Sequence, residues 1–167
     1  MPEPDFAVAP FTIIVDTREQ SPFSFSTIRA DVAQNNAPLV INTTRATLRT
    51  GDYSIEGHET TIAVERKSKS DLFHCVGSDR KRFQQQLERL NALPHPSALV
   101  VEASFLSIQS GDPESLLNPK TVFRSVLAWQ QRLPNVHWWM CPTKAFAEQV
   151  TFRFLERYWK DSTNVDA

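Results

Sequence analysis

Short apolar runs rich in β-branched residues recur along the sequence, and stretches with helical spacing follow several of them. A run of this kind is typical of a strand that a sheet buries on both faces. Four runs have this character, at residues 11–17 (FTIIVDT), 61–67 (TIAVERK), 97–103 (SALVVEA) and 136–141 (VHWWMC). Because helical segments lie between and after them, we expect an α/β domain with a mixed central sheet flanked by helices.

The segments between these runs complete the predicted layout. Residues 39–55 predict one long strand or a bent pair, because Gly51 permits a bulge or a sharp bend there. Asn118 followed by Pro119 is a typical helix start, since Asn accepts hydrogen bonds from free amides and Pro fits the first turn. The predicted helices occupy residues 71–76, 79–93, a stretch from Pro119 to near Pro134, and 143–159.

At 167 residues the chain has the length of one ordinary domain. We predict a flexible arm at residues 1–10, a single domain over residues 11–162 and a short tail at residues 163–167. No apolar run approaches the ~20 residues that a membrane helix requires, so we expect no membrane contact. The first ten residues carry two acids and no Lys or Arg, which is unlike a secretory signal peptide, and the two cysteines are compatible with a reducing cytosol.

The whole chain has a net charge of -1, but one segment is strongly basic. Residues 66–89 contain seven Lys or Arg and only three acids. Arg80, Lys81 and Arg82 fall at a predicted helix start, where the helix dipole itself favours anions. The segment indicates either a local nucleic-acid contact or a solvated helix face.

A GDY string at residues 51–53 and an ERK string at residues 65–67 hold the side chains best suited to chemistry. On a strand, Glu65 and Lys67 point to the same face, ~7 Å apart, and Arg66 points to the other. Asp52 and Glu65 would supply two hard oxygen ligands of the kind that Mg²⁺ accepts, and Lys67 would stabilise a phosphate or a developing hydroxide. The pattern suggests a minimal phosphodiesterase centre. Cross-strand ion pairs use the same residue types, so spacing alone leaves that alternative open.

Four strings together resemble the XPF/Hef-type nuclease domain, which belongs to the PD-(D/E)xK, restriction-endonuclease-like superfamily. They are IVDTRE at residues 14–19, GDY at 51–53, VERKSKSDL at 64–72 and RFQQQ at 82–86. The family pattern is a first strand that ends in D-x-R-E, then G-D, then E-R-K-x-x-x-D, and these elements stand here in that order and spacing. The resemblance is close over residues 11–103 and implies a restriction-endonuclease-like core.

The resemblance implies a role for each matching residue near the centre. Asp52 and Glu65 would be the principal metal ligands, and the backbone carbonyl of Arg66 would complete the set. Lys67 would be the catalytic lysine. Asp16, at the end of the first strand, would be an accessory acid bound to metal or water. The implied cofactor is Mg²⁺ or Mn²⁺.

Further residues would support this centre or contact DNA. Arg18 and Glu19 would order the site or touch a phosphate, although a surface ion pair between Arg18 and Asp71 is an alternative. Asp71 would hold Lys67 or Arg66 in place. The expected DNA-binding residues are Arg66, Arg80, Lys81, Arg82 and Gln86.

The function that the resemblance implies is a metal-dependent DNA endonuclease that hydrolyses phosphodiester bonds, with branched or flap DNA in repair or recombination as its expected substrate. One alternative is a catalytically silent DNA-binding or scaffold module of the same fold, and another is an RNase or mismatch-nicking enzyme. Many family members carry helix–hairpin–helix motifs after the nuclease domain, and their absence from this sequence puts flap recognition in doubt. The expected location is the cytoplasm with the nucleoid, or the nucleus in a eukaryote.

A homodimer is expected as well, because the family pairs through its nuclease domains. The final helix offers a candidate surface, since an apolar belt runs along it. Its members are Phe146, Val150, Phe154 and Tyr158, with an adjoining stripe of Phe152, Leu155 and Trp159. The alternative is that both stripes pack into the core of the monomer.

Overall fold

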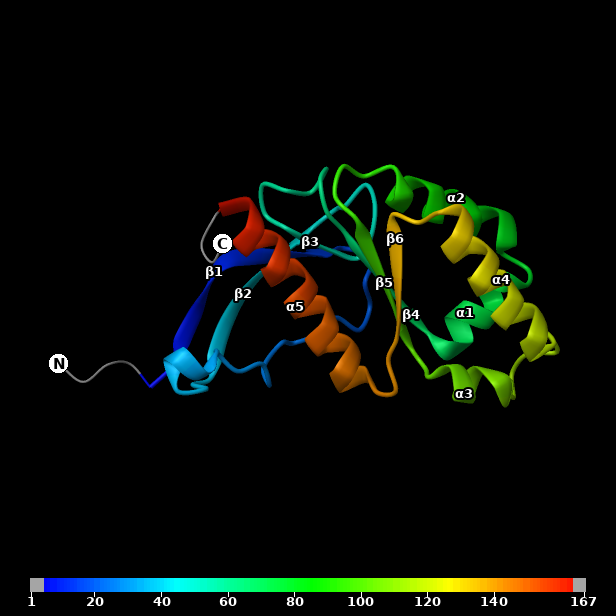
Figure 1. The fold of residues 1–167 in the computed structure, drawn as a ribbon, viewed down its shortest axis with the longest axis horizontal. Coiled ribbons are helices and arrows are strands. Elements are labelled where there is room, and N and C mark those ends of the chain that lie inside the picture. Colours follow the sequence, from blue (N-terminus) through cyan, green and yellow to red (C-terminus); the bar gives the residue numbers. More distant parts are fainter. Residues whose placement is uncertain (1–4, 164–167) are drawn as a thin grey trace.

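A mixed sheet of six strands runs through the centre of the structure, a computed structural model that describes residues 5–163 (Figure 1). In sheet order the strands are β2 (Leu39–Ala46), β1 (Ala7–Asp16), β3 (Tyr53–Ile55), β4 (Val64–Ser68), β5 (Ser97–Glu102) and β6 (Val136–Met140). Strand β3 is antiparallel to both of its neighbours, β1 and β4, and the other adjacent pairs are parallel. The predicted α/β class and mixed sheet are confirmed.

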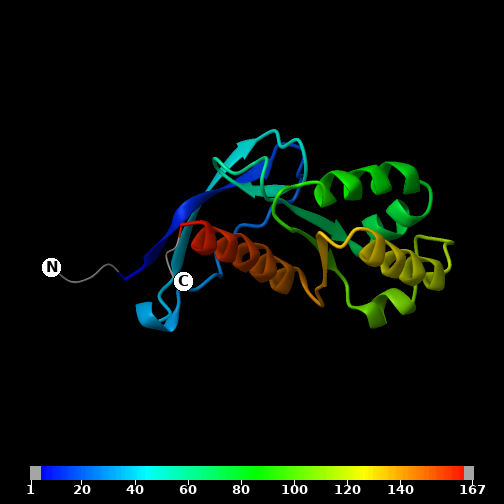
Figure 2. The same cartoon turned by 45° about the horizontal axis from the view of Figure 1, so that its top comes forward.

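Helices cover both faces of the sheet. The long helix α5 (Lys144–Thr163) packs on one face, and α1 (Lys69–Val76), α2 (Arg80–Asn91) and α4 (Pro119–Arg132) pack on the other. Figures 1 and 2 show these three helices grouped at one end of the molecule, with α5 alongside the first strands at the other. A short helix, α3 (Phe105–Gln109), and a 3₁₀ turn at Val32–Gln34 complete the described elements.

Strand β5 shows how one run of sequence supplies two cores. Ala98 and Val100 face the cluster around α5, whereas Leu99 and Val101 face the cluster around α1, α2 and α4. Side chains alternate between faces along a strand, so a continuous apolar run is needed when both faces are covered. All four side chains are fully buried.

Several predicted boundaries were wrong. Strand β1 begins at Ala7, so residues 7–10 are strand and not a flexible arm. Residues 1–4 and 164–167 lie outside the described chain, and α5 runs through residue 163. The segment from 39 to 55 forms two separate strands, β2 and β3, joined by a loop at residues 47–52.

Gly51 is required in that loop. It adopts a φ of +83°, and a Cβ atom added there would lie 2.8 Å from the Cβ of Ala63. Both the backbone conformation and the close approach to the next strand therefore exclude a side chain. Gly51 brings the loop tight against the start of β4.

The apolar belt on α5 is core, which overturns its predicted role as a dimer surface. Phe152, Leu155 and Tyr158 are buried against the sheet, and the partly buried members pack on the same core. Those members are Val150, Phe154 and Trp159. Phe146, at 49% exposure, is the belt's remaining exposed residue. Within residues 5–163, no helix combines the length and the apolar character needed to span a bilayer.

Candidate active site

The pairing of β3 with β4 brings Asp52 and Glu65 together. Tyr53 is the register partner of Val64, so the residues on either side, Asp52 and Glu65, lie opposite each other across the antiparallel pair. The Asp52 amide donates to the Val64 carbonyl at 2.9 Å, and the Arg66 amide donates to Oδ2 of Asp52 at 2.8 Å. Asp52 is therefore fixed against β4 by both its backbone and its side chain.

Lys67 lies beside Glu65 on the same face of β4, as predicted. Its Nζ atom is 3.0 Å from Oε1 of Glu65 and 5.5 Å from the centre of the Phe83 ring. The second carboxylate oxygen of Glu65, Oε2, is buried and has no hydrogen-bond partner among the described residues. A buried carboxylate oxygen without a donor is costly, so this atom is suited to bind an added cation.

The charges of the three residues depend on one another. Burial, followed by the neighbouring Glu65, raises the pKa of Asp52 to about 8. Burial also raises the pKa of Glu65, against the opposing effect of Lys67. Burial is the largest effect and alone would lower the pKa of Lys67, but Glu65, Cys75 and Asp52 together outweigh it, so the ammonium pKa lies above its usual value. Asp52 and Glu65 would both ionise more readily if a second positive charge, in addition to Lys67, lay beside them.

The donor set fits a hard divalent ion that keeps most of its water. The N–H and C=O of a strand residue lie on the same edge, so the carbonyl of Arg66 faces the Asp52 side, as its N–H does. Asp52, Glu65 and this carbonyl would then offer three oxygens, and Mg²⁺ commonly binds through one or two carboxylates with several waters. In the described part of the chain no group of three or more His, Cys, Asp or Glu residues is placed to hold a metal ion, so these two carboxylates and the carbonyl would need water to complete the coordination.

An open pocket of about 380 Å³ gives solvent access to these groups. Among the predicted residues, it is lined by Asp16, Arg18, Asp52, Glu65, Lys67, Asp71, Arg82 and Gln86. The sequence reasoning missed other lining residues, namely Arg49, Thr50, Gly51, His74, Cys75, Asp79 and Arg89. Two of these had detectable signals: Arg49 is two residues before the glycine of GDY, and Arg89 follows Arg82 at helical spacing.

Asp16 lies at the pocket, but its carboxylate is already occupied. It accepts from the amide, Nε and Nη2 of Arg18 and from the amide of Leu48. Burial raises its pKa, but these hydrogen bonds, with that of the Arg18 side chain first, outweigh burial and hold the pKa below its usual value. Asp16 therefore holds Arg18 and the loop at residues 47–52, and its role as an accessory metal ligand stays a prediction.

Arg66 does not line this pocket, but it borders a second hollow of about 440 Å³ that Asp52, Glu65 and Lys67 also line, so its DNA contact stays a prediction. Its guanidinium pairs with Glu102 at 2.5 Å and Glu19 at 3.5 Å, and it donates to the carbonyl of Ser21. It also lies 4.5 Å from the centre of the Phe23 ring. Arg66 and Glu19 therefore fix the loop after β1. Of the two roles predicted for Glu19, this contact agrees with ordering the site.

The Asp71 side chain caps the start of helix α1 and does not hold another residue of the site in place. The Asp71 amide donates to Oγ of Ser68 at 3.1 Å, and the Ser68 amide donates to the Asp71 carboxylate at 3.2 Å. This reciprocal capping box begins α1 directly after the ERK string. The predicted contacts of Asp71 with Lys67, Arg66 or Arg18 are absent among the described ion pairs and hydrogen bonds.

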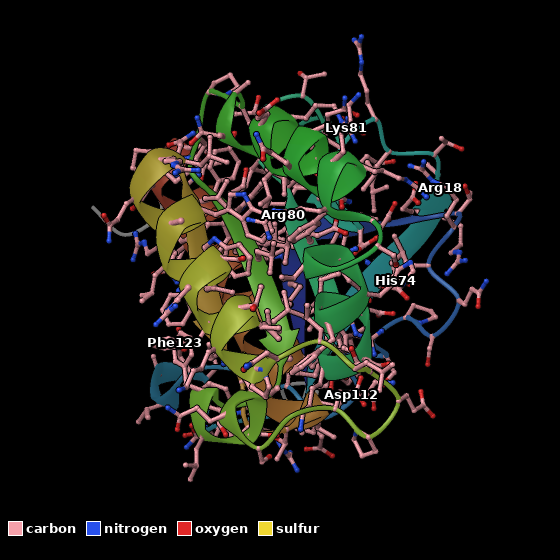
Figure 3. All side chains as sticks on the ribbon, turned by 90° about the vertical axis from the view of Figure 1, so that its right-hand side faces the viewer. Arg18, His74, Arg80, Lys81, Asp112 and Phe123 are labelled. Atoms are coloured by element: carbon pink, nitrogen blue, oxygen red, sulfur yellow. The ribbon has the colours of Figure 1, made fainter. Side chains whose placement is uncertain are left out.

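The basic run at the start of α2 divides between two sides of the helix. Arg82 and Gln86 line the pocket, and Gln86 also lowers the pKa of Glu65. Arg80 is directed toward α4, where it donates to Oγ of Ser125 at 2.8 Å and stacks 4.7 Å from the Trp129 ring centre. Figure 3 shows Arg80 between the two helices, while Arg18 and His74 lie on the other side of α1 and α2.

Lys81 likewise lies off the pocket. It borders a shallow surface hollow on α2 together with Arg80, Gln84, Gln85 and Glu88. Of the three basic residues predicted to bind DNA at this helix start, Arg82 alone lines the candidate site.

Comparison with solved structures supports the fold. XPF from Aeropyrum pernix matches with a TM-score of 0.62 and 16% identity, covering 88% of this chain and 61% of that one. XPF from Aeropyrum pernix in complex with DNA matches with a TM-score of 0.58 and 18% identity, covering 91% and 66%. The chain thus spans less than two thirds of the length of either structure. The fold is that of the XPF nuclease, which is restriction-endonuclease-like.

Sequence comparison gives the family. No curated protein sequence matches this chain. The model of the ERCC4 domain, however, matches residues 15–154, which include the GDY and ERK strings, the last two residues of β1, the other five described strands and about the first half of α5. The chain therefore belongs to the ERCC4 domain family.

Proposed function

We propose that this chain is a divalent-metal-dependent DNA endonuclease. The observation that carries the proposal is the buried, unpartnered Oε2 of Glu65, set opposite Asp52 and beside Lys67 in an open pocket. A purely structural ion pair would leave no carboxylate oxygen buried without a donor. The DNA complex of the similar XPF structure supports nucleic acid as the substrate class.

Asp52, Glu65 and the carbonyl of Arg66 would hold Mg²⁺ or Mn²⁺. The bound ion would polarise the phosphodiester and lower the pKa of a coordinated water. The protein's own part is to place the phosphate. Lys67 would offer its ammonium to the phosphate oxygens as negative charge builds on them. Because the Lys67 pKa is raised by Glu65, the ammonium stays charged at neutral pH.

Substrate contacts would begin on α2. The side chain of Arg82 is 84% exposed and lines the pocket, so its guanidinium is available to bind a backbone phosphate. Gln86, one turn later, also lines the pocket, interacts with Glu65 and would align the strand. We propose branched or flap DNA in repair or recombination as the substrate, and the nucleoid or the nucleus as the location.

A homodimer is part of the proposal, through the sheet edge at β6 together with Phe146, the exposed residue of the α5 belt. Strand β6 is at the edge of the sheet, and an edge strand presents unpaired backbone groups. Trp139, on that strand, is 43% exposed, and Phe146 follows it at the start of α5 with 49% exposure. Sedimentation at micromolar protein would show a species of twice 19.0 kDa, which Trp139→Glu would reduce to a monomer. A wild-type monomer at all concentrations would contradict the dimer.

The test of the enzymatic proposal compares labelled flap, fork, duplex and single-stranded DNA with RNA of the same sequence, in Mg²⁺, Mn²⁺ or EDTA. We expect cleavage of at least one DNA substrate with metal and none in EDTA. Glu65→Gln should abolish it, and the matched control Glu114→Gln, an exposed acid away from the pocket, should not. Binding without cleavage under every condition would favour the scaffold alternative, and cleavage of RNA alone would favour an RNase.

A further inference from the structure

Two arginines line the active-site pocket without any partner of their own. Arg49, from the loop at residues 47–52, and Arg89, from α2, have exposed side chains, and neither makes a hydrogen bond or an ion pair with a described residue. Arg82 has one distant acidic neighbour, with 4.0 Å between its Nη1 and Oδ2 of Asp79. Five carboxylates, those of Asp16, Asp52, Glu65, Asp71 and Asp79, line the same pocket, but Arg49 and Arg89 pair with none of them and are suited to bind an anionic occupant at its border.

The backbone that carries Arg49 is held firmly, although its side chain is free. The Leu48 amide donates to Asp16 at 2.8 Å, and the Leu48 carbonyl accepts from Arg18 at 2.7 Å. Leu48 itself is buried, and Gly51 presses against Ala63 on the other side. The loop is thus anchored just before and just after Arg49, which places its guanidinium at one border of the pocket.

Helix α2 forms the opposite border. Phe83, Leu87 and Leu90 bury one side of this helix. Arg82, Gln86 and Arg89, at positions i, i+4 and i+7, share an adjacent side that lines the pocket. The helix is therefore oriented by its core residues so that its cations line the pocket.

The sheet order places the catalytic groups between these two borders. The loop at residues 47–52 connects β2 with β3, whereas α2 packs over the cluster that includes β5 and β6. Strand β4, with Glu65 and Lys67, lies between β3 and β5. In Figure 3, Arg18, which binds Leu48 of the loop, lies to the right of α2 toward the strands coloured blue and cyan.

We propose that one DNA strand crosses the pocket between this loop and α2, with Arg49 bound to a phosphate on one side of the scissile phosphate and Arg89, with Arg82, bound to phosphates on the other. The inference rests on the proposed endonuclease function and defines how its substrate lies. Carboxylates at the base of the pocket repel phosphates, and cations on both borders offset that repulsion. A pocket of about 380 Å³ is at the small end for ligand sites, which suits one strand better than a whole duplex.

The experiment uses a fluorescein-labelled flap duplex and the variants Arg49→Ala and Arg89→Ala. Arg124→Ala is the matched control, because Arg124 is an exposed arginine on α4 that does not line the pocket. Binding is measured in EDTA by anisotropy. We expect each pocket variant to weaken binding about tenfold, with a salt slope shallower by about 0.7 for a lost single-strand contact, and Arg49→Lys to keep most of the affinity. The control should match the wild-type protein.

Neutral methylphosphonates, placed one at a time along the flap-bearing strand, then locate each contact. Neutralising a contacted phosphate should weaken wild-type binding. Arg49→Ala should become insensitive at a position on one side of the scissile bond, and Arg89→Ala at a position on the other side. Insensitivity of both variants at the same position, or a pattern equal to that of Arg124→Ala, would overturn the proposal.

The two proposals can fail separately. If the wild-type protein cleaves DNA but neither variant shifts the methylphosphonate pattern, the strand path is wrong and the enzymatic function stands. If the wild-type protein binds the flap duplex but cleaves none of the four DNA substrates, the enzymatic function fails, and the binding pattern still decides the path. No binding of the flap duplex by the wild-type protein would overturn the strand path, and cleavage of the other DNA substrates would then decide the enzymatic function.

Discussion

Glu65 and Arg66 are adjacent in sequence, yet their side chains belong to opposite faces of the sheet. Glu65 faces the pocket with Lys67, while the Arg66 guanidinium pairs with Glu102 and borders a second hollow. A single string on β4 therefore supplies both the candidate metal ligand and the ion pair that secures the neighbouring loop. The Arg66 side chain is 11% exposed, which makes its charge dependent on its acidic partners.

The first prediction is that Arg66→Ala destabilises the fold. It would leave the carboxylates of Glu102 and Glu19, both largely buried, without their guanidinium. Removal of one member of a buried ion pair typically lowers the free energy of unfolding by about 3 kcal/mol. Urea unfolding would measure this loss, and Arg66→Lys should recover part of it. Unchanged stability with weakened DNA binding would instead make Arg66 a DNA contact alone.

The second prediction concerns the response of stability to metal. In wild-type protein, Mg²⁺ or Mn²⁺ should raise the melting temperature, because the ion binds the folded state alone. Asp52→Asn should abolish that rise and also the cleavage. In EDTA the same variant should be at least as stable as wild type, since it removes repulsion with Glu65, and the amide oxygen can still accept from Arg66.

Thermal unfolding with and without metal would separate these effects. An Asp52→Asn protein that still gained stability from Mg²⁺ would place the ion elsewhere. Binding of flap DNA in EDTA should be kept or tightened, because a carboxylate near the phosphate is lost.

The meeting of Asp52 with Glu65 and Lys67 could be predicted from the sequence. The GDY and ERK strings each sit at a strand, strand alternation sets Glu65 and Lys67 on one face, and the resemblance supplied the pairing. The long-range partner of Asp16 could not be predicted in this way, whereas Ser68, the capping partner of Asp71, is only three residues away in the sequence. Asp16 is satisfied by Leu48, 32 residues away, and that contact exists only once β1 and the loop have come together.

The sides of α2 show a different limit. The apolar residues of the helix reveal which side is buried, but they leave two polar flanks that are equivalent in sequence. Packing against α4 decides between them. Arg80 contacts Trp129 and Ser125 on α4, whereas Arg82 lies on the other flank and lines the pocket. The prediction of a dimer surface on the α5 belt was wrong for a related reason. The width of sheet that a helix covers depends on strands far away in sequence.

The third prediction is that Lys67→Ala slows cleavage by about 10²–10³-fold at saturating metal and DNA, because it removes a charge that the transition state needs. Lys67→Arg should not restore full activity, since a planar guanidinium does not replace a compact ammonium in the space between Glu65 and Phe83. Single-turnover rates measure the effect, with Lys120→Ala, an exposed lysine on α4, as the control. Complete rescue by excess DNA would reduce Lys67 to a binding residue.

The last prediction separates the three basic residues at the start of α2. Arg82→Ala should weaken DNA binding on all sequences alike and make the salt slope shallower by about 0.7–0.9, because one phosphate contact is lost. Lys81→Ala should leave binding and slope unchanged, since this side chain lies off the pocket. Arg80→Ala should instead lower stability through the lost contacts with Trp129 and Ser125. Salt titrations of binding, paired with urea unfolding of each variant, would measure both properties. Equal loss of DNA binding in all three variants would mean that the whole helix start contacts DNA, and that the division of α2 into two sides has no functional meaning.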